Sequence, residues 1–174
     1  CFPNADVIID KYHFIRQTGW AIEGVRKRIQ KTMPVSLRKY YKRSRKLILT
    51  RYEKLEGESK QSCDIMLLYN DDLRKAHFLK ERFYKICQNS KYSEQRTDFW
   101  SWIREAESSG IPEFEKCART YRHWSKEILN AFKYSHITNG PTEGFNNKIK
   151  VLKRSSYGIR NFEHFRTRIL MVTN

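Results

Sequence analysis

Two acidic residues stand where a carboxylate could do chemistry. Asp10 ends a short apolar run, and Glu143 lies near the start of an amphipathic stretch. Mg²⁺ and Mn²⁺ are held in proteins by a few carboxylates together with waters and substrate phosphate. Two such ions can activate an attacking water or hydroxyl and stabilise the leaving oxygen of a phosphodiester. The two acids therefore lead to the hypothesis of metal-dependent chemistry on phosphodiesters.

The residues after Glu143 strengthen this hypothesis. Residues 138–154 begin with turn residues and continue as a predicted helix, in which Pro141 suits a first helical position. At about 100° per residue, one helix face is apolar and the other is polar. The apolar face carries Phe145, Ile149 and Leu152, and the polar face carries Glu143, Asn146, Asn147, Lys150 and Arg154.

Amides and cations below an acid can hold a scissile phosphate or the backbone that flanks it. Asn147 and Arg154 are the better candidates, since they fall within about 40° of Glu143 around the helix axis. An ordinary solvated face is the alternative, above all for Lys150. A glutamate in a first helical turn is also commonly just favourable to the helix dipole.

Asp10 needs a second element to position it. Residues 5–10 are short, apolar and rich in β-branched side chains, which predicts a buried strand that ends at Asp10. Groups at the carboxyl ends of strands line the crevice where α/β proteins bind ligands. One strand cannot make a sheet. We therefore expect its partners upstream of Cys1, which agrees with a chain that opens without methionine.

The rest of the sequence predicts helices. Apolar residues recur at helical spacing, and glycine or proline interrupts the pattern. We expect a break at 57–60, another at 109–112 and a short extended connector at 134–138. The expected helices cover about 11–33, 35–55, 62–87, 93–108 and 113–132, followed by the Glu143 helix and a last helix from about 161.

Charge favours a polyanionic partner. The chain has 35 Lys and Arg against 19 Asp and Glu, a formal net charge of +16. Such an excess is typical of nucleic-acid binding. An anionic membrane surface is the weaker alternative, because no segment pairs a broad apolar face with a purely basic one, and no run of about 18 apolar residues could span a bilayer. The four cysteines form no C-x-x-C pair, so we expect packed thiols in a reducing cytoplasm.

Most of the excess charge comes from one segment. Residues 26–54 contain twelve Lys or Arg and one acid, Glu53, a local net of +11. Each phosphate that such a segment neutralises adds a salt-dependent increment of affinity. We expect sequence-independent DNA contacts here, with Tyr40 and Tyr41 between the cations. The candidate contacts are Arg26, Lys39, Lys42, Arg43, Arg45 and Lys46.

An aromatic set could stack on bases, but its helical spacing favours core packing. Its members are Phe99, Trp100, Trp102 and Trp124.

Two blocks of the sequence resemble a known family. The tail T-N-G-P-T-E-G-F-N-N-K-I-K-V-L-K-R-S-S-Y-G-I-R-N-F-E-H-F-R-T-R-I-L (138–170) is similar to the C-terminal end of DDE transposases of bacterial insertion sequences, in the ISL3 family. The opening F-P-N-A-D-V-I-I-D-K-Y-H-F-I-R (2–16) resembles the family segment around the second catalytic aspartate.

The resemblance implies a mainly α chain that is the C-terminal part of an RNase H-like α/β core, interrupted by a long all-helical insertion. Core segments would span 1–18 and 134–174, with the insertion at 19–133. It also implies a site of Asp, Asp and Glu that holds two Mg²⁺ (or Mn²⁺) ions in the intact enzyme. Asp10 matches the second aspartate and Glu143 the glutamate.

The family's first aspartate has no counterpart here, and its zinc-binding and helix-turn-helix regions are also missing. The expectation is a transposase fragment that is inactive alone.

His13 has two open interpretations. Related transposases carry a similar D-x-x-H, in which the histidine would orient Asp10 or contact the substrate phosphate. A half-buried histidine that is satisfied by a backbone carbonyl is the alternative.

The implied partner is double-stranded DNA, both the terminal repeats of the element and the target, bound by a homo-oligomer in the bacterial cytoplasm at the nucleoid. The competing function is a basic helical nucleic-acid-binding module without catalysis. It explains the charge but neither the apolar run before Asp10 nor the specific tail.

Overall fold

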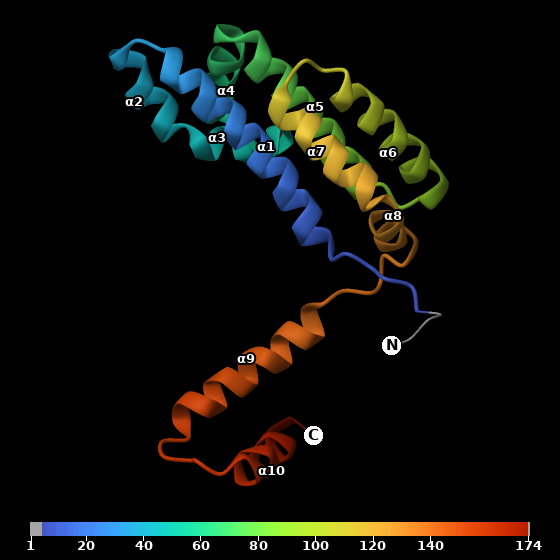
Figure 1. Ribbon diagram of the computed structural model, residues 1–174. Helices are drawn as coiled ribbons and strands as arrows, with labels where there is room; N and C mark the ends of the chain where they lie inside the picture. Colours follow the sequence, from blue (N-terminus) through green and yellow to red (C-terminus); the bar gives the residue numbers. More distant parts are fainter. Residues whose placement is uncertain (1–4, 174) are drawn as a thin grey trace. The chain divides into compact units, whose positions relative to one another are not determined.

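The computed structural model describes residues 5–173, except for the side chains of residues 40–43 and 173. The chain divides into two units, Cys1–Ser135 and His136–Asn174, and each is described by itself (Figure 1). Every regular element among the described residues is a helix, which confirms the mainly helical expectation.

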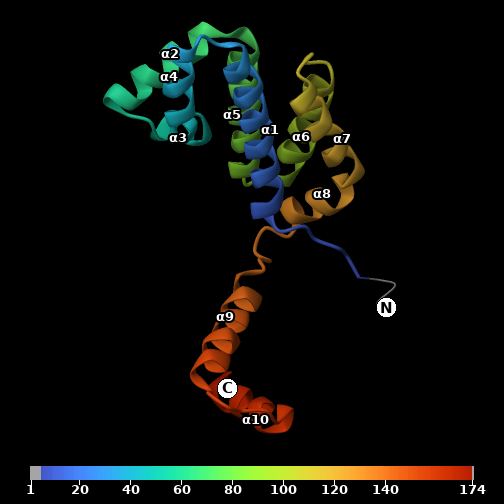
Figure 2. The same ribbon diagram turned by 60° about the vertical axis from the view of Figure 1, so that its left-hand side comes forward.

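Four long helices form the body of the first unit: α1 (Lys11–Thr32), α5 (Asp71–Gln88), α6 (Tyr92–Glu107) and α7 (Pro112–His123). Helix α1 packs against α5 and α7, and α6 packs against α5 and α7. The helices α5, α6 and α7 run alternately in opposite directions, as short connections require (Figure 2). The short helix α8 (Ser125–Lys133) contacts α1, α6 and α7.

Smaller helices flank this bundle. They are α2 (Val35–Arg43), α3 (Arg45–Leu49), the 3₁₀ turn η1 (Tyr52–Lys54) and α4 (Gly57–Tyr69). Helices α2 and α3 contact α1, while α4 contacts α3 and α5. The side chain of Lys80 joins α5 to the end of α3, because its Nζ donates to Ile48 O at 2.7 Å and to Thr50 O at 2.9 Å.

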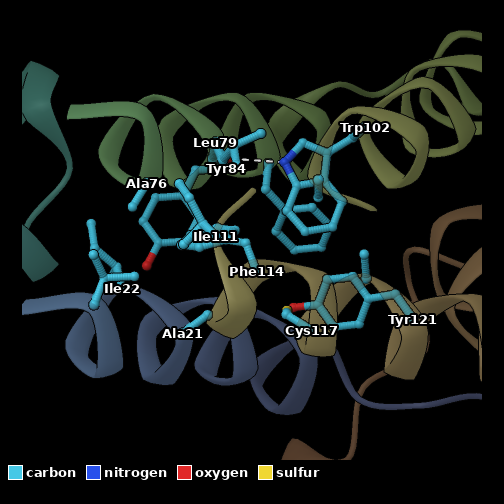
Figure 3. Packing of buried hydrophobic residues seen from close by; sticks show 14 of the residues in the cluster. Ala21, Ile22, Ala76, Leu79, Tyr84, Trp102, Ile111, Phe114, Cys117 and Tyr121 are labelled. Atoms are coloured by element: carbon cyan, nitrogen blue, oxygen red, sulfur yellow. Dashed lines mark hydrogen bonds between the residues drawn. The ribbon is translucent and has the colours of Figure 1, made fainter. Parts of the chain in front are cut away.

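Aromatic residues fill the centre of the bundle. Phe83, Phe99, Trp102 and Tyr121 are fully buried and lie against one another in pairs. Figure 3 shows the indole Nε1 of Trp102 donating to Leu79 O, a bond of 2.8 Å. This burial confirms the structural role expected for Phe99 and Trp102.

The polar end of Tyr121 is also satisfied. Its hydroxyl donates to Phe14 O and accepts from Thr18 Oγ1 at 2.6 Å. Buried polar groups cost free energy unless they are paired, so this bonding lets a tyrosine occupy the core.

The strand expected at 5–10 is absent, and that prediction is wrong. The segment has no regular structure, and Val7 is 60% exposed. A strand requires a neighbour for its backbone groups. Here the Ile9 N–H donates to Glu127 O at 3.4 Å, and Asn130 Nδ2 donates to Val7 O at 3.0 Å. The apolar side chains of Ile8 and Ile9 instead pack at the edge of the helical core.

Several expected helix breaks were misplaced. The break predicted at 57–60 is helical, and the basic helix predicted at 35–55 is divided into α2, α3 and η1. The long helix predicted at 62–87 ends at Tyr69 and restarts after Asn70. The helix predicted at 113–132 is interrupted at Trp124, which is 45% exposed rather than in the core.

The second unit contains α9 (Gly140–Ser155) and α10 (Phe162–Thr173), which pack against each other. Both helices were expected. The expected apolar face of α9 is only partly covered, since Phe145 is 47% exposed and Ile149 and Leu152 are half-buried.

No helix among residues 5–173 has the length and apolar character needed to cross a membrane. The described cysteines, Cys63, Cys87 and Cys117, are free and buried, as expected for packed thiols. Burial raises the pKa of Cys63 to about 11 and those of Cys87 and Cys117 to about 12. These thiols are therefore protonated at neutral pH and unreactive.

Candidate functional site

Asp10 is the N-cap of α1. Its Oδ1 accepts the Tyr12 N–H at 2.8 Å, and its backbone oxygen accepts the His13 N–H at 3.0 Å. An aspartate in this position satisfies helix N–H groups that would otherwise lack partners. Asp10 is partly exposed. The cap therefore fixes the carboxylate at the start of α1, at the surface of the first unit.

His13 follows on the first turn of α1 and is exposed. Its ring lies edge-on to the Tyr12 ring, with the centroids 5.6 Å apart. The half-buried alternative is therefore wrong for this structure. An exposed imidazole three residues after Asp10 remains accessible to a ligand.

Glu143 lies in the first turn of α9, in the second unit. Its N–H donates to Asn139 O at 3.0 Å, and its Oε1 accepts from Asn139 Nδ2 at 3.4 Å. A carboxylate here is stabilised by the positive end of the helix dipole. Pro141 also lies in the first turn, as predicted.

The polar face of α9 is present as predicted. Asn146, Asn147 and Arg154 are exposed, and Lys150 is exposed on the same helix. Arg154 lies in the last turn, where a cation is favourable to the dipole. The second unit thus presents an acid at one end of an exposed amide and cation face.

Asp10 and Glu143 belong to different units, so the pair is not placed in one site. Among residues 5–173, no three His, Cys, Asp or Glu side chains gather as a metal-binding group. Carboxylate oxygens are the ligand type that Mg²⁺ and Mn²⁺ prefer. Asp10 and Glu143 each supply an oxygen ligand of that type.

Only some of the cations in the basic segment at residues 26–54 are exposed to solvent. Arg26 is 4% exposed, and its guanidinium donates to Glu23 and to Gln30. Burial alone would raise the pKa of Glu23, but the hydrogen bond and charge of Arg26, helped by Arg45 and Lys27, lower it. Arg26 is therefore a structural partner of Glu23, and its assignment as a DNA contact is corrected.

Arg28 also forms ion pairs within the first unit. It binds Glu113 at 2.9 Å and Asp72 at 3.0 Å, which joins α1 to the starts of α7 and α5. Lys39 and Lys46 are exposed, and Arg45 is exposed although its Nε lies 3.2 Å from Glu23 Oε1. Lys42 and Arg43, with Tyr40 and Tyr41, lie outside the described side chains. The basic surface is thus smaller than the sequence count implies.

A cavity of about 490 Å³ beside η1, α4 and α5 contains none of the predicted site residues. His77 lines it, is 5% exposed, and has no hydrogen-bond partner at Nε2. Burial, with the charge of Lys80, lowers the pKa of His77 to about 3. The imidazole is therefore neutral at physiological pH.

One exposed row escaped the sequence analysis. Tyr12, Arg16 and Trp20 follow one another on α1, with the Arg16 guanidinium 4.6 Å from the Trp20 ring and 5.8 Å from the Tyr12 ring. The available signal was the spacing of four residues, which puts side chains on one helix face.

Comparison with known proteins gives two relatives. The chain is 27% identical over 168 residues to the transposase for insertion sequence element IS1001 of Bordetella parapertussis, covering 94% of this chain and 41% of that protein. It is 37% identical over 91 residues to a Lactococcus lactis subsp. lactis protein named ATP-dependent protease, covering 51% of this chain and 29% of that protein. The chain therefore spans less than half the length of these relatives. No solved structure matches it.

A family model identifies the family of this chain. The model is described as transposase, of the ISL3 group, and it matches residues 1–169. That match includes the opening block, the basic segment, all of the helical bundle and the tail block up to residue 169. The chain belongs to the ISL3 family of DDE transposases.

Proposed function

We propose that this chain carries two of the three catalytic acids of a DNA transposase, Asp10 and Glu143, on an RNase H-like core whose helical insertion is the first-unit bundle. The complete enzyme would hydrolyse a phosphodiester at the ends of an insertion sequence. It would then use the freed 3′-hydroxyl to attack target DNA. The family implies DNA as the partner and a divalent metal requirement.

One observation carries the proposal. Both acids are held at helix N-termini by local hydrogen bonds, Asp10 by the Tyr12 N–H and Glu143 by Asn139. These bonds hold one carboxylate oxygen of each side chain and leave Asp10 partly exposed and Glu143 exposed. A metal ligand needs such a fixed but accessible oxygen. The positions also match the family pattern in both blocks.

The roles follow from the side chains. Asp10 and Glu143 would hold the metal ions, which when bound supply Lewis acidity to the attacking and leaving oxygens. Asn147 and Arg154 would contact the phosphate or its flanking backbone, with Asn146 and Lys150 beside them. His13 would orient the scissile phosphate or Asp10. No position of this chain matches the first aspartate, so the chain by itself would bind DNA without cleaving it.

Substitution of Glu143 tests this function. In a full-length family transposase that carries this segment, we expect Glu143→Gln to abolish detectable cleavage at the element ends, because a metal ligand is lost. DNA binding, measured by gel shift, should remain. The matched control is Glu163→Gln, an exposed acid in the first turn of α10, which should leave cleavage unchanged. Cleavage that persists in Glu143→Gln would refute the assignment.

A basic helical binding module without catalysis is the second candidate, and the all-helical structure of the described residues favours it. It predicts that the full-length protein lacks cleavage with Mg²⁺ or Mn²⁺ even when both acids are intact.

A further inference from the structure

The exposed face of α1 combines aromatic rings with a cation. Tyr12 is 62% exposed and Trp20 is 55% exposed. The Arg16 guanidinium lies over both rings, at 5.8 Å and 4.6 Å from their centroids. Large exposed aromatics are uncommon on a solvated helix, and here they form one continuous row. We call Tyr12, Arg16 and Trp20 the α1 row.

Beyond Asp10 at its start, the exposed charge along this face of α1 is positive. Lys27 and Lys31 continue the exposed surface of α1 toward its end. The sole acid of α1 in the sequence is Glu23, which is 8% exposed and paired with Arg26. No carboxylate of α1 therefore competes for the Arg16 guanidinium. A partner for this face must offer flat apolar surfaces and negative charge together.

Unpaired DNA has this combination. Its bases expose their π-faces, and its phosphates supply the negative charge, so it binds to aromatic and basic surfaces by stacking and ion pairing. Bases in duplex DNA are already stacked on each other and cannot lie on a protein ring unless they leave the stack. Tyr, Trp and Arg are also common at protein interfaces, but the net charge of +16 and the transposase family favour DNA as the partner of this face.

The row begins beside the proposed catalytic acid. The Tyr12 N–H donates to Asp10 Oδ1 at 2.8 Å, so the first ring of the row is two residues from that carboxylate. Trp20 lies eight residues further, about 12 Å along the helix axis. A strand that leaves the scissile phosphate could therefore follow the row over a few nucleotides.

We propose that the α1 row is a stacking platform for unpaired bases of DNA next to the scissile phosphodiester. The position of these bases rests on the proposed function, whereas the stacking itself does not. The substrate that this implies is DNA whose bases are unpaired at the cleavage point, rather than a continuous duplex.

Trp20 fluorescence provides the test in the 174-residue chain. Trp124→Phe removes the other strongly exposed indole, which leaves Trp20 as the main accessible reporter. We expect oligo(dT) to quench the emission, and a duplex of equal length at equal salt to quench it much less. In the chain that keeps Trp124, the anisotropy of dye-labelled DNA should show that Trp20→Ala weakens oligo(dT) binding about tenfold and duplex binding less than twofold. Trp20→Phe should restore most of the single-strand affinity, because it keeps an aromatic ring.

Trp124→Ala is the matched control, since it removes a comparably exposed indole that is not part of the row. Far-ultraviolet circular dichroism establishes that each variant is folded. Equal losses for oligo(dT) and duplex, or no loss with Trp20→Ala, would overturn the proposal. If neither oligo(dT) nor the duplex changed the Trp20 emission, the proposal would also be overturned, and this face would be assigned to packing against protein.

The failure of this proposal is separable from that of the proposed function. Glu163→Gln should leave oligo(dT) affinity unchanged, because Glu163 lies on α10, outside the row and outside the proposed metal site. If the full-length Glu143→Gln protein still cleaves DNA while Trp20→Ala loses single-strand affinity, the platform stands and the catalytic assignment falls.

Discussion

At the scale of single residues, burial separates structural charges from functional ones. Arg26 and Lys80 are cations that the sequence cannot distinguish from surface lysines or arginines, yet both are buried and bonded to the protein. Asp10 and Glu143 remain accessible. The sequence predicted that Glu143 lies in a first helical turn, whereas Asp10, expected at the end of a strand, is the N-cap of α1. The sequence could not predict the burial of Arg26, which depends on Glu23 and Gln30 meeting it in a packed bundle.

His77 gives a pH prediction at this scale. Its pKa of about 3 in the folded protein lies below the usual value for histidine, because burial disfavours the charged ring. Between pH 3 and about pH 6.5, His77 binds a proton in the unfolded chain but not in the folded protein. Its contribution to stability is therefore fully present above about pH 6.5 and is lost as the pH falls toward 3. We expect a loss on the order of 3 kcal/mol between pH 6.5 and 4 from this residue, measured by urea unfolding.

His77→Asn should reduce the dependence of the free energy of unfolding on pH in this acidic range. The control is His123→Asn, which replaces an exposed histidine and should keep the wild-type slope. Parallel profiles for His77→Asn and the wild type would show that other groups cause the acid loss.

At the scale of elements, helix positions were easier to predict than helix ends. The apolar repeat on α1 and α6 spans whole turns, so both helices were predicted to within a residue or two. The break at Asn70 was missed because the apolar repeat continues across it. The pairing partners of the expected strand at 5–10 are a tertiary property, which no local pattern contains.

The Asn70 cap can be tested directly. Its side-chain oxygen accepts the Leu73 N–H at 3.0 Å and starts α5. We expect Asn70→Ala to lower the free energy of unfolding by about 1 kcal/mol, and Asn70→Asp to retain most of it, since aspartate also caps. Thermal or urea denaturation measures both. If alanine and aspartate were equally destabilising, the loss would come from something other than the cap.

At the scale of the whole molecule, net charge predicted the partner class but overstated the binding surface. The +16 of the chain includes Arg26 and Arg28, which are committed to internal ion pairs. The exposed cations of the same segment, such as Lys39 and Lys46, are the ones able to release counterions from DNA. Family membership rests on the family-model match over residues 1–169 and not on this charge.

The salt dependence of duplex binding distinguishes the exposed cations from the cations that form internal ion pairs. We expect Lys39→Gln and Lys46→Gln each to reduce the slope of log affinity against log salt by up to about 1, with stability unchanged. Arg28→Gln should instead lower stability while it leaves the slope unchanged, because its partners are Glu113 and Asp72. A change of slope in Arg28→Gln alone would place the DNA surface elsewhere.

The central claim is that Asp10 and Glu143 are metal ligands of a transposase, and a metal-specificity switch tests it most directly. In the full-length protein, Asp10→Cys and Glu143→Cys each replace an oxygen ligand by a thiolate, which suits softer ions better than Mg²⁺. The measurement is strand cleavage at the element ends in Mg²⁺ and in Mn²⁺. We predict that both variants are inactive in Mg²⁺ and regain cleavage in Mn²⁺, while the wild type cleaves in both. Cleavage in Mg²⁺ at the wild-type rate by either variant would contradict the claim.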